Sequence, residues 1–473
     1  MKTHIRRLGK GLLLAVPLLL GLYGFVFVEK LPFMQSLFNC VCMYCLNYQD
    51  PPLNLWIEGA RWLAPLATAS GVVLLVQHFH TSIRNAWAYC KGNSVAVFGP
   101  EEVRADLLEE LGSRGIPMND KWVKAHSYVL LGTEQENLAF YQRYQRRLKD
   151  KHVYIQCRAL PAMATTDPNV HLFCPEETAA RHFWKANCPY ALSVRKEHQL
   201  RITILGFDKL GKELLLSALQ YNIFHPQQKI EYHILGEEKG FSRVYHQLHQ
   251  ITDPVFFHPE PWYAHIDLIR ESDMVLVTEI PDQLSVVSEL SLAIPNQKLF
   301  VFAAQQGLGV LQEQNPNIHI FNWQAYARKK DAILNVGLYD LAMSVNLRYA
   351  HLYNGVTECK ENQLPQWVKL DTFARYSNIS TADYHKIRQI MLREKGWCAP
   401  LNEIQMEEMA ELEHIRWCRY HFLNNWQQGT PKNGKAKDPE NRIHKSLIPY
   451  AELSENEKDK DRQVVDILLS LEV

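Results

Sequence analysis

Aromatic rings and cations suited to ligand binding are concentrated in the C-terminal part of the chain. Residues 409–429 have the sequence MAELEHIRWCRYHFLNNWQQG, and residues 444–465 have HKSLIPYAELSENEKDKDRQVV. Aromatic faces stack on flat groups such as a base, and arginine and lysine bind phosphate. We therefore predict a ligand-binding set; burial of Trp417, Trp426 and Tyr450 in a core is the alternative. The predicted set is Arg416, Trp426, His444, Lys445, Tyr450, Lys460 and Arg462.

A second candidate site is the turn GFDKLG at residues 206–211, between an apolar strand pattern and a helix pattern. In a dinucleotide-binding turn, successive glycines make the turn, admit the pyrophosphate and pack the helix on the strand. Gly206 and Gly211 fill the first and third positions. Asp208 stands at the middle one, where its carboxylate would either repel a phosphate or coordinate a cation beside it. With Glu237 as the ribose-binding acid, these residues predict NAD or another nucleotide as ligand; a scaffold without ligand is the alternative.

Reaction chemistry has little support in the sequence. Read as a P-loop, the turn fails because Glu213 stands where Ser or Thr would bind magnesium. Cysteine, histidine and serine show no pairing at catalytic spacing. Cys40, Cys42 and Cys45 match no standard zinc spacing, so we favour a short helix over Phe33–Tyr48 rather than a metal site. We predict no catalytic residues, no metal and no enzymatic activity.

Two series of alternating strands and helices must position the candidate residues. Such alternation predicts parallel, doubly wound sheets, and hence an α/β protein with two tandem Rossmann-like domains. The expected strands of the first domain are Ser94–Gly99, Ser127–Gly132, His152–Cys157 and His171–Cys174, with helices over Glu101–Arg114, Glu134–Lys149 and Glu176–Asn187. The expected strands of the second are Arg201–Leu205, Lys229–Leu235, Met274–Thr278 and Leu299–Ala303. A helix is expected over Lys330–Tyr353, a polar, irregular linker over Glu361–Thr381 that contains a helix through Trp367 and Phe373, and a helix over Tyr384–Lys395.

The C-terminal stretch resembles the ryanodine-receptor (RyR) repeat domain. The resemblance predicts a small, mainly α domain of two helices around the bend at Leu447–Tyr450, with Ser454 as N-cap and Glu457 completing a capping box. It rests on Glu413, His414, Arg416, Trp417, Asn425, Trp426, Gly429, His444, Leu447–Tyr450, Leu453, Glu457, Lys458 and Lys460–Arg462.

The tandem domains resemble the regulator-of-potassium-conductance (RCK, or TrkA N-terminal) domains. The resemblance covers about residues 94–323 and rests on the order of elements and the sequence ITILGFDKLGKEL. It implies binding of a nucleotide and assembly into oligomeric rings, so we expect a homo-oligomer.

Two apolar runs lie near the N-terminus, Gly11–Val28 and Gly59–His78. About twenty apolar residues in a helix span the hydrocarbon core, so we predict two membrane helices; a cleaved signal peptide and a buried core helix are the alternatives. Lys2, Arg6 and Arg7 before the first run place both termini in the cytoplasm by the positive-inside rule. The order and size of this region resemble two-span potassium-channel subunits, although the potassium filter sequence is absent.

The composition limits the kinds of partner that can be expected. The formal net charge is +0, which gives no global field for nucleic acid. Seven of the 10 cysteines are scattered in a part predicted to be cytoplasmic, so no disulfide framework is expected. The predicted domains are 1–89 (membrane), 90–195 and 196–355 (Rossmann-like), 356–397 (linker) and 398–473 (RyR).

These features lead to two functional hypotheses. In the first, a nucleotide-type ligand binds the RyR or Rossmann domains of a channel-like protein in the bacterial inner membrane and gates or remodels its membrane part. Ion homeostasis or a membrane-disrupting role in bacterial defence would suit such a protein. In the second, the chain is a membrane-tethered binding scaffold without conduction. The predicted partners are the lipid bilayer, a small nucleotide-type ligand and further copies of the chain, and no nucleic acid.

Overall fold

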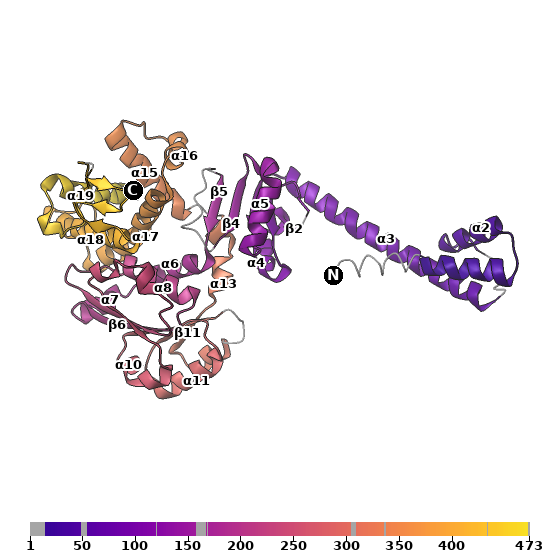
Figure 1. Ribbon diagram of the computed structural model, residues 1–473, viewed down its shortest axis with the longest axis horizontal. Helices are drawn as coiled ribbons and strands as arrows, with labels where there is room; N and C mark the ends of the chain where they lie inside the picture. The colour runs from indigo at the N-terminus through magenta and orange to yellow at the C-terminus, as the bar shows by residue number, and fades with distance from the viewer. Residues whose placement is uncertain are drawn as a thin grey trace. The chain divides into compact units, whose positions relative to one another are not determined.

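The computed structural model describes residues 15–48, 54–119, 121–157, 167, 169–303, 309–334, 337–432 and 434–471. For residues 71, 73–78, 80, 81, 337 and 338 it describes the backbone only. The chain forms two compact units, Met1–Gly92 and Asn93–Val473. Figure 1 shows the elements of both units.

The N-terminal unit is helical. Its elements are a helix over residues 15–22, the π-helix η1 (Tyr23–Val28), α2 (Phe33–Tyr44) and α3 (Leu55–Cys90). Glycines let the first segment approach its neighbours, since a Cβ at Gly21 would lie 2.7 Å from Cys40 Sγ and one at Gly24 would lie 2.6 Å from Ile57 Cγ1. Asn54 caps α3 by accepting hydrogen bonds from the amides of Trp56 and Ile57. The short helix predicted over Phe33–Tyr48 is therefore present as α2.

The prediction of two membrane helices is wrong for the described residues, because none of their helices is long and apolar enough to cross a membrane. In the first predicted span, residues 11–14 lie outside the described residues, and the helix over 15–22 changes into the π-helix at Tyr23. The described run is then shorter than the roughly 20 residues that a span needs. The second predicted span, residues 59–78, lies within α3, and for residues 71 and 73–78 only the backbone is described.

The first parallel sheet has the strand order β2-β1-β3-β4-β5. Its strands are β1 (Val95–Phe98), β2 (Gly115–Met118), β3 (Ser127–Leu130), β4 (His152–Gln156) and β5 (Val170–Phe173). The helices α4 (Glu101–Leu111) and α5 (Glu134–Leu148) connect strands of this sheet. Val97, Leu107, Val129 and Tyr154 are among the residues that form its core with α4.

The second parallel sheet has the order β11-β10-β9-β6-β7-β8. Its strands are β6 (Gln199–Leu205), β7 (Lys229–Leu235), β8 (Val255–His258), β9 (Met274–Val277), β10 (Leu299–Phe302) and β11 (Ile318–Phe321). Numbered from β6, this is the strand order 3-2-1-4-5-6 of the Rossmann fold, whose ligands bind at the carboxyl ends of the strands beside the point where the order reverses. Here that point lies between β6 and β9.

The α/β expectation with Rossmann-like parallel sheets is confirmed, with strands that the sequence analysis did not identify. β2, β8 and β11 are short, and their residues include proline or lack a strong apolar alternation. The expected helix over Lys330–Tyr353 appears as α14 (Lys330–Ile333) and α15 (Gly337–Asn354), with residues 335 and 336 outside the described residues.

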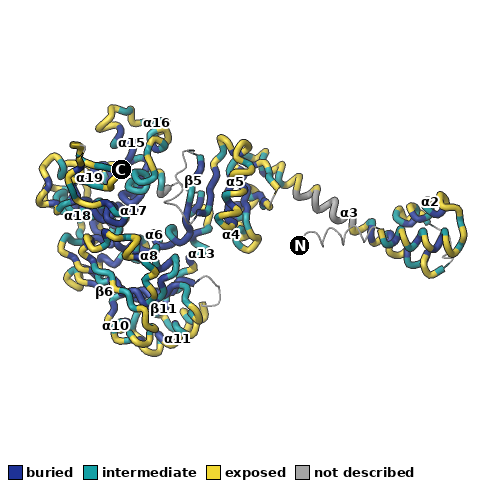
Figure 2. The backbone as a smooth tube through the Cα atoms, viewed as in Figure 1, coloured by how far each residue is buried: buried dark blue, intermediate teal, exposed yellow. Residues whose placement is uncertain are grey.

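The segment predicted as a linker with a helix, Glu361–Thr381, is more helical than expected, because it contains most of α16 (Lys360–Trp367) and the start of α17 (Thr372–Lys395). Many polar residues of α17 lie inside the protein. Ser380, Thr381, Asp383, His385 and Arg388 are all buried. Figure 2 shows α17 as largely buried.

One hydrophobic core joins the second sheet to the C-terminal helices. α6 (Pro175–Ala186), α8 (Lys209–Tyr221), α17, α18 (Glu403–Leu423) and α19 (Glu455–Ser470) all contribute to it. α6 and α17 pack on α8, α18 packs on both α8 and α17, and α19 packs on α18. The C-terminal helices therefore fold against the second sheet and share its core.

Candidate functional site

The turn after β6 brings the predicted nucleotide-binding residues close together. Gly206 has φ +91°, and a Cβ there would lie 2.3 Å from the hydroxyl oxygen of Thr278 at the end of β9. A Cβ on Gly211 would lie 2.4 Å from the carbonyl oxygen of Gly206. Both positions therefore require glycine for close packing, as the first and third glycines of a nucleotide-binding turn do.

Asp208 occupies the helix end where a phosphate would bind in a dinucleotide site. Its side chain accepts a hydrogen bond from the amide of Gly211 at 2.8 Å and caps α8. Burial raises the pKa of this carboxyl, and hydrogen bonds from Gly211 and Thr278 lower it again. Because a carboxylate already satisfies the N-terminus of α8, a phosphate group would have to bind elsewhere.

Glu237, the predicted ribose-binding acid, is exposed and does not line the cavity beside this turn. The neighbouring Glu238 does line the cavity, and its carboxylate accepts a hydrogen bond from the amide of Ser242 at 2.8 Å. The acid that follows the second strand of the sheet is thus displaced by one residue from the predicted position.

A cavity of about 1000 Å³ opens at this turn. Its walls come from the turn after β6 and the first turns of α8, from α6, from the segment 238–245, from the start of α17, and from the end of α18 with the loop that follows. A cavity of this volume lies at the upper end of the usual range for small-molecule sites. Segments far apart in the sequence therefore share one concave surface.

Aromatic rings form one part of the cavity lining. Phe373 of α17 stacks on Trp426, with ring centroids 5.2 Å apart and planes inclined by 28°. The Phe373 ring also lies 5.0 Å from that of Tyr420. On the wall formed by the second sheet, Phe207 and Phe241 meet edge to face at 5.3 Å. Flat, sequence-distant rings of this kind are suited to hold a planar heterocycle.

Cations and acids share the rest of the lining. Lys209, Lys212 and Arg442 line the cavity, and the ammonium of Lys212 lies 5.2 Å from the centre of the Tyr245 ring. Glu213 lies beside them, and burial raises its pKa to about 7, with the negative charge of Glu177 adding to the shift. The lining therefore offers cations for phosphate and acids that accept hydrogen bonds from hydroxyl and amino groups.

Arg181 of α6 connects the cavity to a buried charged cluster. Its guanidinium pairs with Asp383 of α17, which also accepts hydrogen bonds from Lys185 at 2.9 Å and from the Tyr221 hydroxyl at 3.2 Å. These cations hold the pKa of Asp383 at about 2 despite its burial. Arg181 lines the cavity, and its buried Nη2 has no hydrogen-bond partner among the described residues. Such an unpaired buried donor indicates capacity for a further acceptor.

The C-terminal helices α18 and α19 pack against each other and are joined by a segment whose bend ends in the 3-10 turn Tyr450–Glu452. A small sheet of β12 (Gln427–Gln428), β13 (Lys437–Asp438) and β14 (Ile443–His444), in the order β12-β14-β13, precedes this bend. Asn402 and Gln405 form a capping box at the start of α18. Two helices with an intervening bend are the arrangement that the sequence resemblance predicted.

Residues 400–471 form a RyR domain. The family model of the RyR domain matches this segment of the chain. No curated protein and no solved structure matches the chain. The comparison therefore assigns the RyR domain alone, and α18 and α19 are its two long helices.

The structure distributes the predicted ligand-binding residues of the RyR domain over several places. Trp426 lines the cavity. His444 packs edge to face on Trp417 with ring centroids 4.9 Å apart, in the half-buried group behind Trp426. Lys460 pairs with Glu457 at 3.0 Å, and Lys445 lies 4.0 Å from the same carboxylate.

The remaining predicted residues are held by partners inside the RyR domain. Arg416 is buried and pairs with Glu413 at 2.8 Å. The Tyr450 hydroxyl donates to Glu407 at 2.9 Å, and Arg462 pairs with Glu407, Glu455 and Asp459. The predicted set therefore does not converge on one point, and Trp426 is the member that reaches the cavity.

The capping box predicted for α19 is wrong. Ser454 is its N-cap, but its side chain makes no capping hydrogen bond. Glu457 instead accepts a hydrogen bond from the Ser446 hydroxyl at 2.9 Å, in addition to its contact with Lys460. Competition from these partners explains why the reciprocal cap does not form.

Several cavity residues were missed from the sequence. Lys209 and Lys212 lie on the first turn of α8, directly after the glycine turn, and their positions were a usable signal. Arg181 lies on α6, which precedes the strands of the second sheet in the sequence, and Phe373 lies on α17, which follows them. Only the packing of α6 and α17 on α8 brings them to the cavity, and no local pattern shows it.

Proposed function

We propose that this protein is a receptor for a nucleotide-type ligand, NAD or another nucleotide, which binds without turnover in the cavity between the second Rossmann-like sheet and the RyR domain. The observation that carries the proposal is that the turn after β6 and Trp426 line the same cavity. The two predicted binding regions thus contribute to one site, which neither could form alone.

The lining suits each part of a nucleotide. Phe373 and Trp426 offer stacked aromatic surface to a base. Lys212 and Arg442 offer cations to phosphate, away from the N-terminus of α8 that Asp208 already caps. Glu238 can accept hydrogen bonds from ribose hydroxyl groups, as acids after the second strand of a Rossmann fold do.

Ligand binding here would bear directly on α17, because this helix contributes Phe373 and Tyr376 to the cavity and packs on α6, α8, α15 and α18. A signal would then be a change in the order or position of α17. Gating of a membrane part is not proposed, because that hypothesis required the two predicted membrane helices. Assembly into a homo-oligomer and a role in bacterial defence stay predictions.

The proposal can be tested by calorimetric titration of the full chain with a panel of NAD, mono-, di- and cyclic nucleotides. Lys212→Gln should weaken the tightest of these by about tenfold, since one charge-assisted contact is worth about 1.5–3 kcal/mol and part of that is recovered by water. Phe373→Leu should weaken it to a similar extent. Arg270→Gln is the matched control, because its exposed pair with Asp267 lies on α10 (Ile266–Arg270) and outside the cavity lining.

Two results would contradict the proposal. The first is that no nucleotide of the panel binds the folded full-length chain, which would favour a scaffold that recruits a protein partner. The second is that a nucleotide binds and that Lys212→Gln and Phe373→Leu leave its affinity at the level of the Arg270→Gln control.

A further inference from the structure

A cluster of histidines and acids lies at the end of the edge strand β8, separate from the residues that line the cavity. His258, Glu260 and His265 each offer one ligand atom, and these atoms all lie within 4.8 Å of one another. His265 Nε2 is 3.2 Å from a carboxylate oxygen of Glu260. The rings of His258 and His265 have centroids 4.7 Å apart. The sequence alone predicted no metal site.

We propose that His258, Glu260 and His265 bind a borderline divalent transition-metal ion of the Zn²⁺ class. Two imidazole nitrogens and one carboxylate oxygen are ligands that such ions prefer. Ligands about 2.0–2.2 Å from one tetrahedral ion lie about 3.4 Å apart. The 3.2 Å contact of Glu260 with His265 has this spacing, and the largely exposed Glu260 side chain is free to rotate onto an ion.

The backbone of the segment is fixed without a metal. Glu260 lies between Pro259 and Pro261, whose rings restrict the chain on both sides of the carboxylate. The carbonyl oxygen of Pro261 accepts a hydrogen bond from the amide of Ala264 at 2.9 Å, within the 3-10 turn that carries His265. The carbonyl oxygen of His258 accepts one from the amide of Gly236 at 2.8 Å. A preorganised loop lowers the entropy cost of bringing three ligands to one ion.

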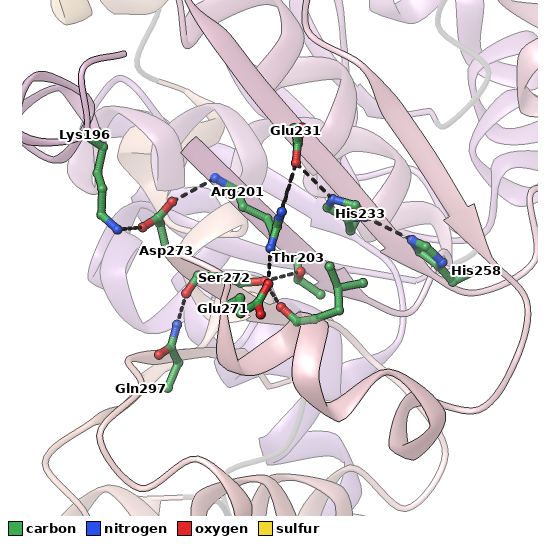
Figure 3. A network of polar contacts seen from close by, with 11 residues as sticks. Lys196, Arg201, Thr203, Glu231, His233, His258, Glu271, Ser272, Asp273 and Gln297 are labelled. Atoms are coloured by element: carbon green, nitrogen blue, oxygen red, sulfur yellow. Dashed lines mark hydrogen bonds and ion pairs between the residues drawn. The ribbon is translucent and has the colours of Figure 1, made fainter. Parts of the chain in front are cut away.

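An outer layer of polar contacts orients the first ligand. His258 Nε2 lies 3.0 Å from His233 Nδ1, and His233 Nε2 lies 3.6 Å from a carboxylate oxygen of Glu231 (Figure 3). Glu231 is held in turn by Arg201 at 3.3 Å. Metal-bound histidines usually have such hydrogen-bonded partners, which set the ring orientation. Three protein ligands leave a fourth position of the ion for water or another ligand.

The test uses the full chain, freed of metal with a chelator and titrated with Zn²⁺ against a chromophoric competitor, and separately with Co²⁺ to record its visible absorption. We expect one Zn²⁺ per chain with micromolar or tighter affinity, and a Co²⁺ spectrum without thiolate charge-transfer bands. Glu260→Gln and His265→Ala should each weaken Zn²⁺ binding at least about tenfold, as loss of a ligand does.

His246→Ala is the control, since His246 is an exposed histidine of the same domain outside the cluster. Circular dichroism of each variant checks folding, and the exposed position of Glu260 makes Glu260→Gln safe in this respect. The proposal is overturned if the wild-type chain does not bind Zn²⁺ with this affinity, if both cluster variants bind it like the His246→Ala control, or if Co²⁺ shows thiolate ligation. None of these results bears on nucleotide binding in the cavity.

Discussion

The two parallel sheets have the same first step and different surroundings. β1 and β6 each end in a glycine with positive φ, +139° at Gly99 and +91° at Gly206. After β1, the helix α4 starts without a side-chain cap and has Glu101 and Glu102 in its first turn. After β6, Asp208 caps α8, and no acid lies in the first turn of that helix. Acids at a helix N-terminus stabilise the helix but repel phosphate.

The two sheets differ more in the elements that pack over the carboxyl ends of their strands. The turn after β6 faces α6, α17 and the RyR domain, which together with it line the large cavity, and no residue of the turn after β1 takes part in that lining. The glycine turn is therefore not what distinguishes a candidate binding site here. The helices α6 and α17 and the RyR domain, which pack over the turn, form the concave surface.

The largest effect on the helices that cover the second sheet is expected from removing the Asp383 charge, which joins α6 to α17. Asp383→Asn leaves Lys185 without its anion and removes the nearer of the two carboxylate partners of Arg181, which keeps Glu177 at 3.7 Å. Loss of one partner of a buried ion pair costs about 3–5 kcal/mol, and we expect a loss of this size in the free energy of unfolding, measured in urea.

The matched change near the first sheet is Arg104→Gln, which removes hydrogen bonds from the Arg104 guanidinium to the Met118 carbonyl and to Asn119. It should cost about 1 kcal/mol or less. Equal losses for the two variants would mean that the cover of the second sheet has no special role in stability.

A smaller effect is expected from adding a methyl group to each glycine turn. Positive φ at a non-glycine residue costs about 1–3 kcal/mol, and Gly99→Ala and Gly206→Ala should both show it. Gly206→Ala should lose more, because its Cβ would lie 2.3 Å from the Thr278 hydroxyl, which donates to the Leu205 carbonyl. The nearest atom to a Cβ on Gly99 is 3.0 Å away.

Gly240→Ala separates strain from crowding in this series. Gly240 also has a positive φ, +76°, but a Cβ there meets nothing within 4 Å. Thermal unfolding should rank the losses as Gly206→Ala, then Gly99→Ala, then Gly240→Ala. A Gly206→Ala loss no larger than that of Gly240→Ala would show that Thr278 yields easily and that the turn is not tightly packed.

The smallest expected effect is a pH dependence confined to the cavity. Burial, and next the charge of Glu177, raise the pKa of Glu213 from 4.5 to about 7, while Lys212 and Lys209 oppose the shift. Glu213 is thus neutral below about pH 7 in the folded protein, and its ionisation above that pH adds a negative charge beside the ligand. Affinity for a phosphodiester ligand such as NAD should fall roughly fivefold, about 1 kcal/mol, as the pH rises through 7.

Calorimetry at several pH values measures this effect, and Glu213→Gln should flatten it. The sign for stability is the same: the folded state binds the proton more tightly than the unfolded state, so stability falls as the pH rises from about 4.5 to 7. An affinity that rises with pH, or a Glu213→Gln variant whose affinity has the same pH dependence as the wild type, would show that Glu213 does not influence ligand binding.

Alternation of strands and helices was enough to predict both parallel sheets, because strands such as β1, β9 and β10 are continuous apolar runs. The same reasoning did not show that α17 is one continuous buried helix from Thr372 to Lys395. Its Asp383 and Arg388 look like surface residues in the sequence, but they pair with Arg181 and Glu413 inside the protein. Charges that are buried in pairs cannot be told from exposed ones by hydropathy.

The candidate site was predictable only in halves. The glycine spacing indicated Gly206 and Gly211, and the RyR pattern indicated Trp426. That they meet follows from α6 and α17 packing on α8, which sequence separation conceals.

The core shared by α8, α17 and α18 has a practical consequence for anyone who treats the RyR repeat as a portable module. Met409, Leu412 and Phe422 pack in one cluster with Tyr384, Ile387 and Leu215. Excising residues 400–471 would uncover apolar surface on both fragments, and neither should then stay soluble on its own. A transplant to another host would have to carry α17 as well, and the host would need to offer a surface like that of α8.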